Sequence, residues 1–174
     1  LVQKPDGHLY GTTAFGGRAN YGTVFKMSPE GTLTTIVEFD DQIGISGQNP
    51  VAPLFLTADG RLIGSTSDSG GAGTIFQISA SDAFSTWVEL WTQRTPPPDD
   101  NLISRMPVGR LIQVAGGDFF GCSQLGGGDS WNRGSVFRLS ATGTVSRIYS
   151  FGSDQLDGFP TSELTPATYI FRSL

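Results

Sequence analysis

Residues 7–28 decide the fold: they read GHLYGTTAFGGRANYGTVFKMS, and the same arrangement returns twice further along the chain. The opening motif recurs as GRLIGST at 60–66 and as GDFFGCS at 117–123, each time followed by a glycine pair or triplet. The closing motif, GTVFKMS at 22–28, recurs as GTIFQIS at 73–79 and GSVFRLS at 134–140. Motifs that recur in the same order at similar spacings indicate an internal repeat.

A Pro–Leu pair, four residues apart, marks where each further copy begins. The Leu stands six residues before the first glycine of the opening motif, as Leu54 does before Gly60. On this register the chain is one repeat array over 1–174, with copies at 1–53, 54–110 and 111–163 and a partial copy at 164–174. We therefore expect about three structural units and part of a fourth.

Each copy is expected to form four short antiparallel strands, which in the second copy are residues 54–58, 62–66, 73–79 and 85–91. Asp59-Gly60 is a typical hairpin turn between the first two strands. The third strand carries Phe76 and Ile78 on one face and Ile75 on the other, so both faces are expected to be covered. These features predict an all-β fold, a β-propeller-like array of four-stranded antiparallel blades. A β-trefoil, which also has three four-stranded repeats, is the alternative.

The composition excludes several classes of protein. Gly supplies 24 of the 174 residues, about twice the ordinary share, which argues against helical bundles. Aromatic residues reach 11%, which argues against disorder, and a net charge of −5 disfavours nucleic-acid binding. The sequence lacks an apolar stretch of about 18 residues, so no membrane span is expected. A single His and a single Cys leave too few ligands for a zinc site, and no cofactor is predicted.

The order of these motifs resembles the GloVer-type, choice-of-anchor tandem repeat of bacteria. The second copy departs from that pattern at residues 81–83, where Ser-Asp-Ala replaces the Gly-Thr turn. The resemblance implies a propeller-like protein that is extracellular or on the bacterial cell surface, and it supplies no catalytic residues. Because propellers close with about 4–8 blades, we also expect the chain to be part of a longer array.

Carboxylates recur between the fourth strand of a copy and the next Pro: Asp40 and Asp41, Asp99 and Asp100, and Asp154 and Asp157. Repetition would bring them to one rim of the array. They are interpreted as solvated turn residues, as ligands of Ca²⁺ (Asp154 and Asp157) or of a polar molecule, or as an acid–base pair of the kind glycosidases use.

Two aromatic residues, Tyr21 and Trp131, lie in the loops between the second and third strands. Such side chains could stack on sugar rings, and the alternative is that they cover the ends of adjacent strands. The longest insertion, residues 92–106, joins the second copy to the third, and long loops on a rigid scaffold often carry binding.

The sequence therefore favours a non-enzymatic, secreted or cell-surface scaffold that binds a glycan or protein through its rim loops. Two alternatives remain open. One is a carbohydrate-active propeller that uses the rim carboxylates, and the other is a purely structural array within a longer protein.

Overall fold

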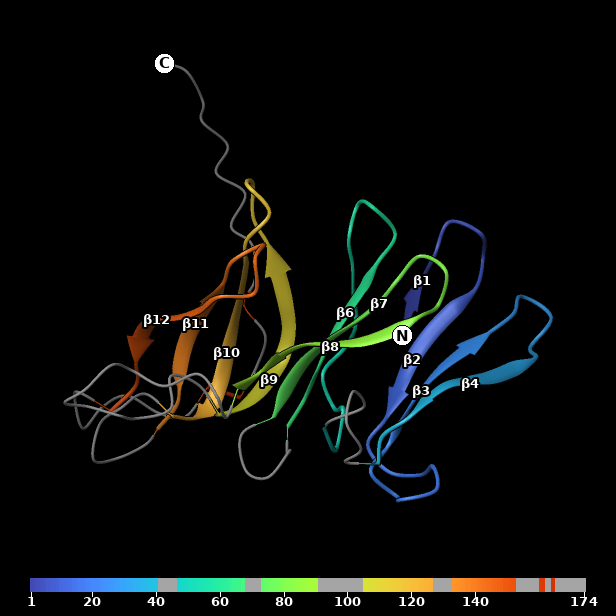
Figure 1. Ribbon diagram of the computed structural model, residues 1–174, viewed down its shortest axis with the longest axis horizontal. Helices are drawn as coiled ribbons and strands as arrows, with labels where there is room; N and C mark the ends of the chain where they lie inside the picture. The colour runs from blue at the N-terminus through green and yellow to red at the C-terminus, as the bar shows by residue number, and fades with distance from the viewer. Residues whose placement is uncertain are drawn as a thin grey trace, which may run out of the picture.

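The chain folds into three separate four-stranded sheets, which stand side by side in chain order (Figure 1). This computed structural model describes residues 1–40, 47–67, 73–90, 105–126, 133–152, 160–161 and 164. Within these ranges, no helix is long and apolar enough to cross a membrane.

Each sheet is an up-and-down meander in which strands adjacent in sequence are adjacent in space. Blade 1 comprises β1 (Val2–Gln3), β2 (Leu9–Thr13), β3 (Thr23–Met27) and β4 (Leu33–Glu38). Blade 2 comprises β5 (Phe55–Leu56), β6 (Leu62–Thr66), β7 (Thr74–Ile78) and β8 (Phe84–Glu89). Blade 3 comprises β9 (Arg105–Gln113), β10 (Phe119–Leu125), β11 (Ser135–Leu139) and β12 (Val145–Ser150).

The prediction of a propeller-like array of antiparallel blades is confirmed. All strand pairs of the described chain lie within one blade, whereas a β-trefoil would pair strands of different repeats into one barrel. The three blades also share their register, down to an irregularity at the same point of the third strand, after Val24, Ile75 and Val136. The copy boundaries remain a prediction, and the one at 110/111 falls within β9.

The core lies between the blades. We call the face of a blade that points to the preceding blade its leading face, and the opposite one its trailing face. The trailing face of blade 1 and the leading face of blade 2 form one buried cluster: Tyr10, Val24, Val37 and Phe39 with Leu54, Leu62, Phe76 and Ile78. Blades 2 and 3 form the equivalent cluster: Ile63, Ile75, Val88 and Leu90 with Leu111, Phe119, Phe137, Leu139 and Val145. A blade between two others is thus apolar on both faces, which explains the pattern of the third strand.

A glycine in the second strand of every blade makes this packing possible. A Cβ at Gly64 would lie 2.7 Å from Cε2 of Phe76 and 2.8 Å from Cδ2 of Leu54. Equivalent neighbours, a Phe from the third strand and a Leu just before or within the first strand, crowd Gly11 (Phe25 and Leu1) and Gly121 (Phe137 and Leu111). The far end of the Phe ring therefore reaches over the glycine, in space that a side chain there would fill. The sequence analysis noted these glycines within the motif but assigned them no role.

We expect Gly64→Ala to lower the free energy of unfolding by about 1–3 kcal/mol, because an added methyl group overpacks a filled core. Urea denaturation followed by circular dichroism measures the change. Phe76→Leu in the same chain removes the ring that the methyl group would meet, so the double variant should be more stable than the two separate losses predict. Strictly additive losses would show that this contact is not the cause.

Candidate functional site

Two sets of loops meet at one end of each blade. β2 ends at Thr13, β3 begins at Thr23 and β4 ends at Glu38, so the β2–β3 loop and the connection to blade 2 leave from the same end. We call this the loop end, and the opposite one, with the β1–β2 and β3–β4 turns, the hairpin end. In Figure 1 the strand β2 points down to the loop end. The described ends of the segments that carry the aromatic and acidic residues singled out in the sequence lie at this loop end.

Gly22 contacts both the start and the end of the connection between blades 1 and 2. Gly22 has a φ of +101°, and a Cβ there would lie 2.6 Å from Cδ of Pro50. Its carbonyl accepts a hydrogen bond from the N–H of Phe39, at 3.1 Å. The first and the last residues of the connection thus contact the same backbone unit.

The second connection is anchored in the same way. The carbonyl of Gly73 accepts from the N–H of Leu90 at 3.1 Å, and Cδ of Pro107 lies 2.8 Å from where a Cβ of Gly73 would be. In blade 3 the carbonyl of Gly134 accepts from the N–H of Phe151 at 3.0 Å. The length and sequence of a connection can therefore vary without moving the points at which it leaves and rejoins the array.

The backbone of Asn49 forms hydrogen bonds to residues of both loop sets. Its N–H donates to the carbonyl of Tyr21 at 2.9 Å, and its own carbonyl accepts from the N–H of Ser67 at 3.2 Å and from the Ser67 hydroxyl at 3.1 Å. The loop of blade 1, the connection and the next blade are joined at this residue.

Of the predicted site residues, the structure describes Tyr21. Its side chain is half-buried and packs against the cluster between blades 1 and 2. The other candidates lie outside the described residues: Asp99, Asp100, Trp131, Asp154 and Asp157. Their positions in the sequence assign them to segments that leave the described blades at the loop end, after Leu90, Gly126 and Phe151.

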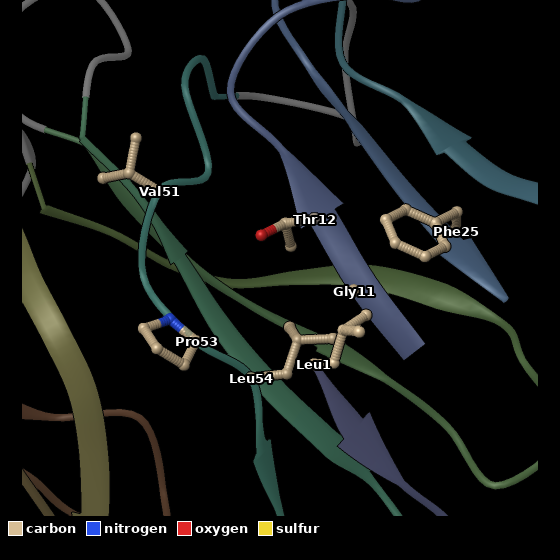
Figure 2. Close-up of a pocket in the computed structure, with 7 residues that line it drawn as sticks. All are labelled: Leu1, Gly11, Thr12, Phe25, Val51, Pro53 and Leu54. Carbon is tan, nitrogen blue, oxygen red and sulfur yellow. The ribbon is translucent and has the colours of Figure 1, made fainter. Parts of the chain in front are cut away.

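A pocket of about 350 Å³ opens between blade 1 and the segment that leads into blade 2 (Figure 2). Its described lining is Leu1, Gly11, Thr12, Phe25, Val51, Pro53 and Leu54. Figure 2 shows the Thr12 hydroxyl directed toward the segment that carries Val51 and Pro53. None of these lining side chains is ionisable, so the side chains could hold an apolar group with one hydrogen bond but supply no acid or base. The sequence analysis did not identify this pocket, since its lining comes from four separate segments.

The strongest charged cluster lies elsewhere, between blades 1 and 2 at the hairpin end. Asp82, in the β7–β8 turn, accepts from Nζ of Lys26 at 2.8 Å, from the Tyr10 hydroxyl at 2.9 Å and from Nζ of Lys4 at 3.3 Å. Nζ of Lys4 also lies 4.4 Å from the centre of the Tyr10 ring. Lys4 is only 7% exposed, and Asp82 is the counter-ion of its ammonium group.

These contacts keep Asp82 and Lys26 ionised. Partial burial raises the pKa of Asp82, but the hydrogen bonds from Lys26, Tyr10 and Lys4 outweigh it and hold this pKa below the ordinary 3.8. The hydrogen bond to Asp82, followed by that to Tyr10, raises the pKa of Lys26. Lys26 therefore stays protonated at neutral pH and cannot act as a general base, which makes the cluster a junction between blades rather than a catalytic site.

The remaining reactive side chains of the described chain are also isolated. Cys122 is buried, and burial raises the pKa of its thiol, which suppresses the nucleophilic thiolate. Nδ1 of His8 lies 3.1 Å from Oδ2 of Asp6, beside a turn. The described ranges contain no group of three or more His, Cys, Asp or Glu side chains that could hold a metal ion.

We expect Asp82→Asn to lower the free energy of unfolding at pH 7 by about 1–3 kcal/mol, since it leaves a buried Lys4 without its counter-ion. Asp59→Asn, which affects an exposed pair with Arg61, is the matched control and should change it by about 1 kcal/mol at most. Urea denaturation of the three proteins measures both effects.

The difference between wild type and Asp82→Asn should also depend on pH. Because the pKa of Asp82 is lower in the folded state, the unfolded chain takes up the proton first as the pH falls. The stabilisation is complete above about pH 4, the pKa of an Asp in an unfolded chain, and is lost as the pH falls through the folded-state pKa. A difference that is constant from pH 7 to pH 2 would contradict this assignment.

Solved structures share this architecture. The chain superimposes on streptogramin B lyase with a TM-score of 0.53 over 92% of its own length and 42% of that chain, at 17% identity. A structure provisionally assigned as a gluconolactonase gives a TM-score of 0.48 over 86% of this chain and 46% of that one, also at 17% identity. The chain thus spans less than half the length of either protein, and at this identity the likeness to the lyase supports the fold alone.

Sequence comparison identifies the family. No curated protein matches the chain. The family model of the Gloeobacter/Verrucomicrobia repeat matches residues 1–171, in agreement with the GloVer-type resemblance of its motifs. The chain, with its three repeated blades, belongs to the Gloeobacter/Verrucomicrobia repeat family.

Proposed function

We propose that this repeat scaffold is non-enzymatic, is secreted or displayed on the bacterial cell surface, and binds a glycan or protein ligand through the loops at its loop end. The location rests on the family resemblance, since GloVer-type repeats occur in proteins with surface anchors. The binding role rests on how the loops are attached.

The observation that carries the proposal is the double anchoring of the connections at Gly22 and Gly73. Each of these glycines contacts the residue with which a connection begins and the Pro with which it ends. A rigid frame with fixed attachment points and variable loops is the usual arrangement of a binding surface. The connection over residues 91–106 is the longest of them, and it carries Asp99 and Asp100.

The residues assigned to this rim suit a glycan. Carboxylates such as Asp99 and Asp154 can accept hydrogen bonds from sugar hydroxyls, and Asp154 with Asp157 could recruit Ca²⁺. Aromatic rings such as those of Tyr21 and Trp131 offer apolar faces to a sugar ring. A protein ligand could use the same aromatic and acidic groups.

The alternative is a carbohydrate-active enzyme whose acid and base are among the same rim carboxylates. We retain this alternative because the chain shares its fold with a lyase. The described residues argue against this alternative, because their cluster of Asp82 with Lys4 and Lys26 is held between two blades. A third possibility is an array that is purely structural.

The test is binding to a glycan array, paired with release of reducing ends from soluble polysaccharides. We expect the wild-type chain to bind at least one glycan without cleaving it. Asp99→Asn with Asp100→Asn should weaken that binding by about tenfold, the effect expected for two central contacts. Glu30→Gln, at the exposed tip of the β3–β4 turn at the hairpin end, is the matched control and should bind as wild type does.

Other outcomes would reject the proposal. Reducing ends released by the wild type, but not by variants with Asn at positions 99, 100, 154 or 157, would identify an enzyme. A structural array would be identified by two negative results together. The wild type would bind no glycan, and it would capture no cell-envelope protein reproducibly that the double variant fails to capture.

A further inference from the structure

The junction between blades 2 and 3 contains a cation at a position where the other two blades have a neutral residue. Arg147 lies in β12, opposite Phe137 of β11 and two residues after Val145. Residues opposite each other in an antiparallel pair, like alternate residues of one strand, point to the same face of the sheet. Because Phe137 and Val145 are buried against blade 2, the side chain of Arg147 belongs to the same leading face. The equivalent residues of blades 1 and 2 are Thr35 and Thr86.

The guanidinium group of Arg147 lacks an acceptor among the described residues. Its Nη1 atom is buried and forms no hydrogen bond within this part of the chain, while the residue as a whole is half-buried. An arginine stays protonated at neutral pH, so this donor without a partner is also part of a charge. A buried polar group without a partner is costly, and a charged one more so. Such a group in a folded protein requires an explanation, and a bound ion supplies one.

The junction between blades 1 and 2 shows how this array accommodates a cation. There Lys4 and Lys26 share the carboxylate of Asp82, which comes from the β7–β8 turn of the following blade. The same turn of blade 3 has Gly143 in place of Asp82, and a Cβ at Gly143 would lie 3.2 Å from Nε1 of Trp87. The acid of the first junction therefore has no counterpart in this turn of the second.

We propose that Arg147 binds the carboxylate of a small monocarboxylic acid at the outer edge of the junction between blades 2 and 3. β8 and β12 are the last strands of their sheets, so in the described chain this edge is not covered by a further strand. The half-buried side chain of Arg147 is accessible from there. A planar guanidinium group matches the geometry of a carboxylate, which can accept two hydrogen bonds from it. The neighbouring cluster is apolar, so the carboxylate is the part of the ligand that this site holds by charge.

Thermal unfolding in the presence of a carboxylate tests the proposal. Sodium glucuronate at tens of millimolar should raise the midpoint of wild-type unfolding by about 2–4 °C relative to NaCl of equal ionic strength, because a ligand that binds only the folded chain stabilises it. Glucose, which has no charge, should have no effect. A parallel series with sodium acetate distinguishes a site for the carboxylate alone, where both salts act equally, from a site that also holds the sugar ring. Either result of that series supports the carboxylate site.

The variant Arg147→Thr gives blade 3 the residue that the other two blades have at this position. Without a carboxylate it should unfold at a higher temperature than the wild type, because it removes a charge that has no partner in the described chain. It should also lose the response to glucuronate. Arg138→Gln is the matched control, because it affects an arginine that is already paired with Asp118, and it should keep the wild-type response.

Three results would each overturn the proposal. The first is a wild-type midpoint that glucuronate and acetate raise no more than NaCl does. The second is a response to glucuronate that persists in Arg147→Thr. The third is a lower midpoint of Arg147→Thr without a carboxylate, which would show that the arginine already has a partner within the chain. None of these results bears on ligand binding by the loops, which the Asn variants at positions 99 and 100 test separately.

Discussion

The close approach of a Phe ring to a strand without a side chain is the contact on which the array depends. Gly11, Gly64 and Gly121 each leave space for the Phe of the third strand and for a Leu at or just before the first strand. Those two side chains form much of the leading face, and the leading face buries the trailing face of the preceding blade. A single methyl group at Gly64 or Gly121 would therefore disturb a whole junction between blades, since protein interiors are close-packed.

A second set of glycines allows the loops to vary while the blades, which form the frame of the array, stay unchanged. Gly22 and Gly73 adopt a backbone conformation open to few other residues, and each contacts both the start and the end of a connection. Closing a longer connection costs little, because the entropy of loop closure grows slowly with length. The frame can thus keep its register while the connections differ from copy to copy, as those over 39–50 and 91–106 do in this chain. Binding specificity can change in such an arrangement without a change in the core.

The sequence predicted the frame well, because the frame is periodic. The strand expected at 73–79 is β7, Thr74–Ile78, and the both-sided apolar pattern of that strand follows from its place between two blades. The first strand was expected at 54–58, yet β5 is only Phe55–Leu56, since propensity does not reveal where pairing with the neighbour ends. Gly64 was not given a role because its importance comes from Phe76 and Leu54, which are distant in sequence. The pocket beside Thr12 was missed for the same reason.

The second copy departs from the repeat at residues 81–83, and this departure has a structural role that the repeat pattern does not reveal. Residues 81–83 of the second copy looked like a loss of the Gly-Thr turn, but the structure shows Asp82 in the left-handed conformation of the glycine it replaces. Gly143, at the same position in blade 3, lies beside Trp87: a Cβ there would be 3.2 Å from the indole Nε1, where Asp82 has two lysines as partners. Identical apolar faces would let any blade pack on any other. Because a buried charge without its counter-ion is costly, the Lys4–Lys26–Asp82 cluster favours the packing of blade 2 on blade 1, which are also neighbours in the chain.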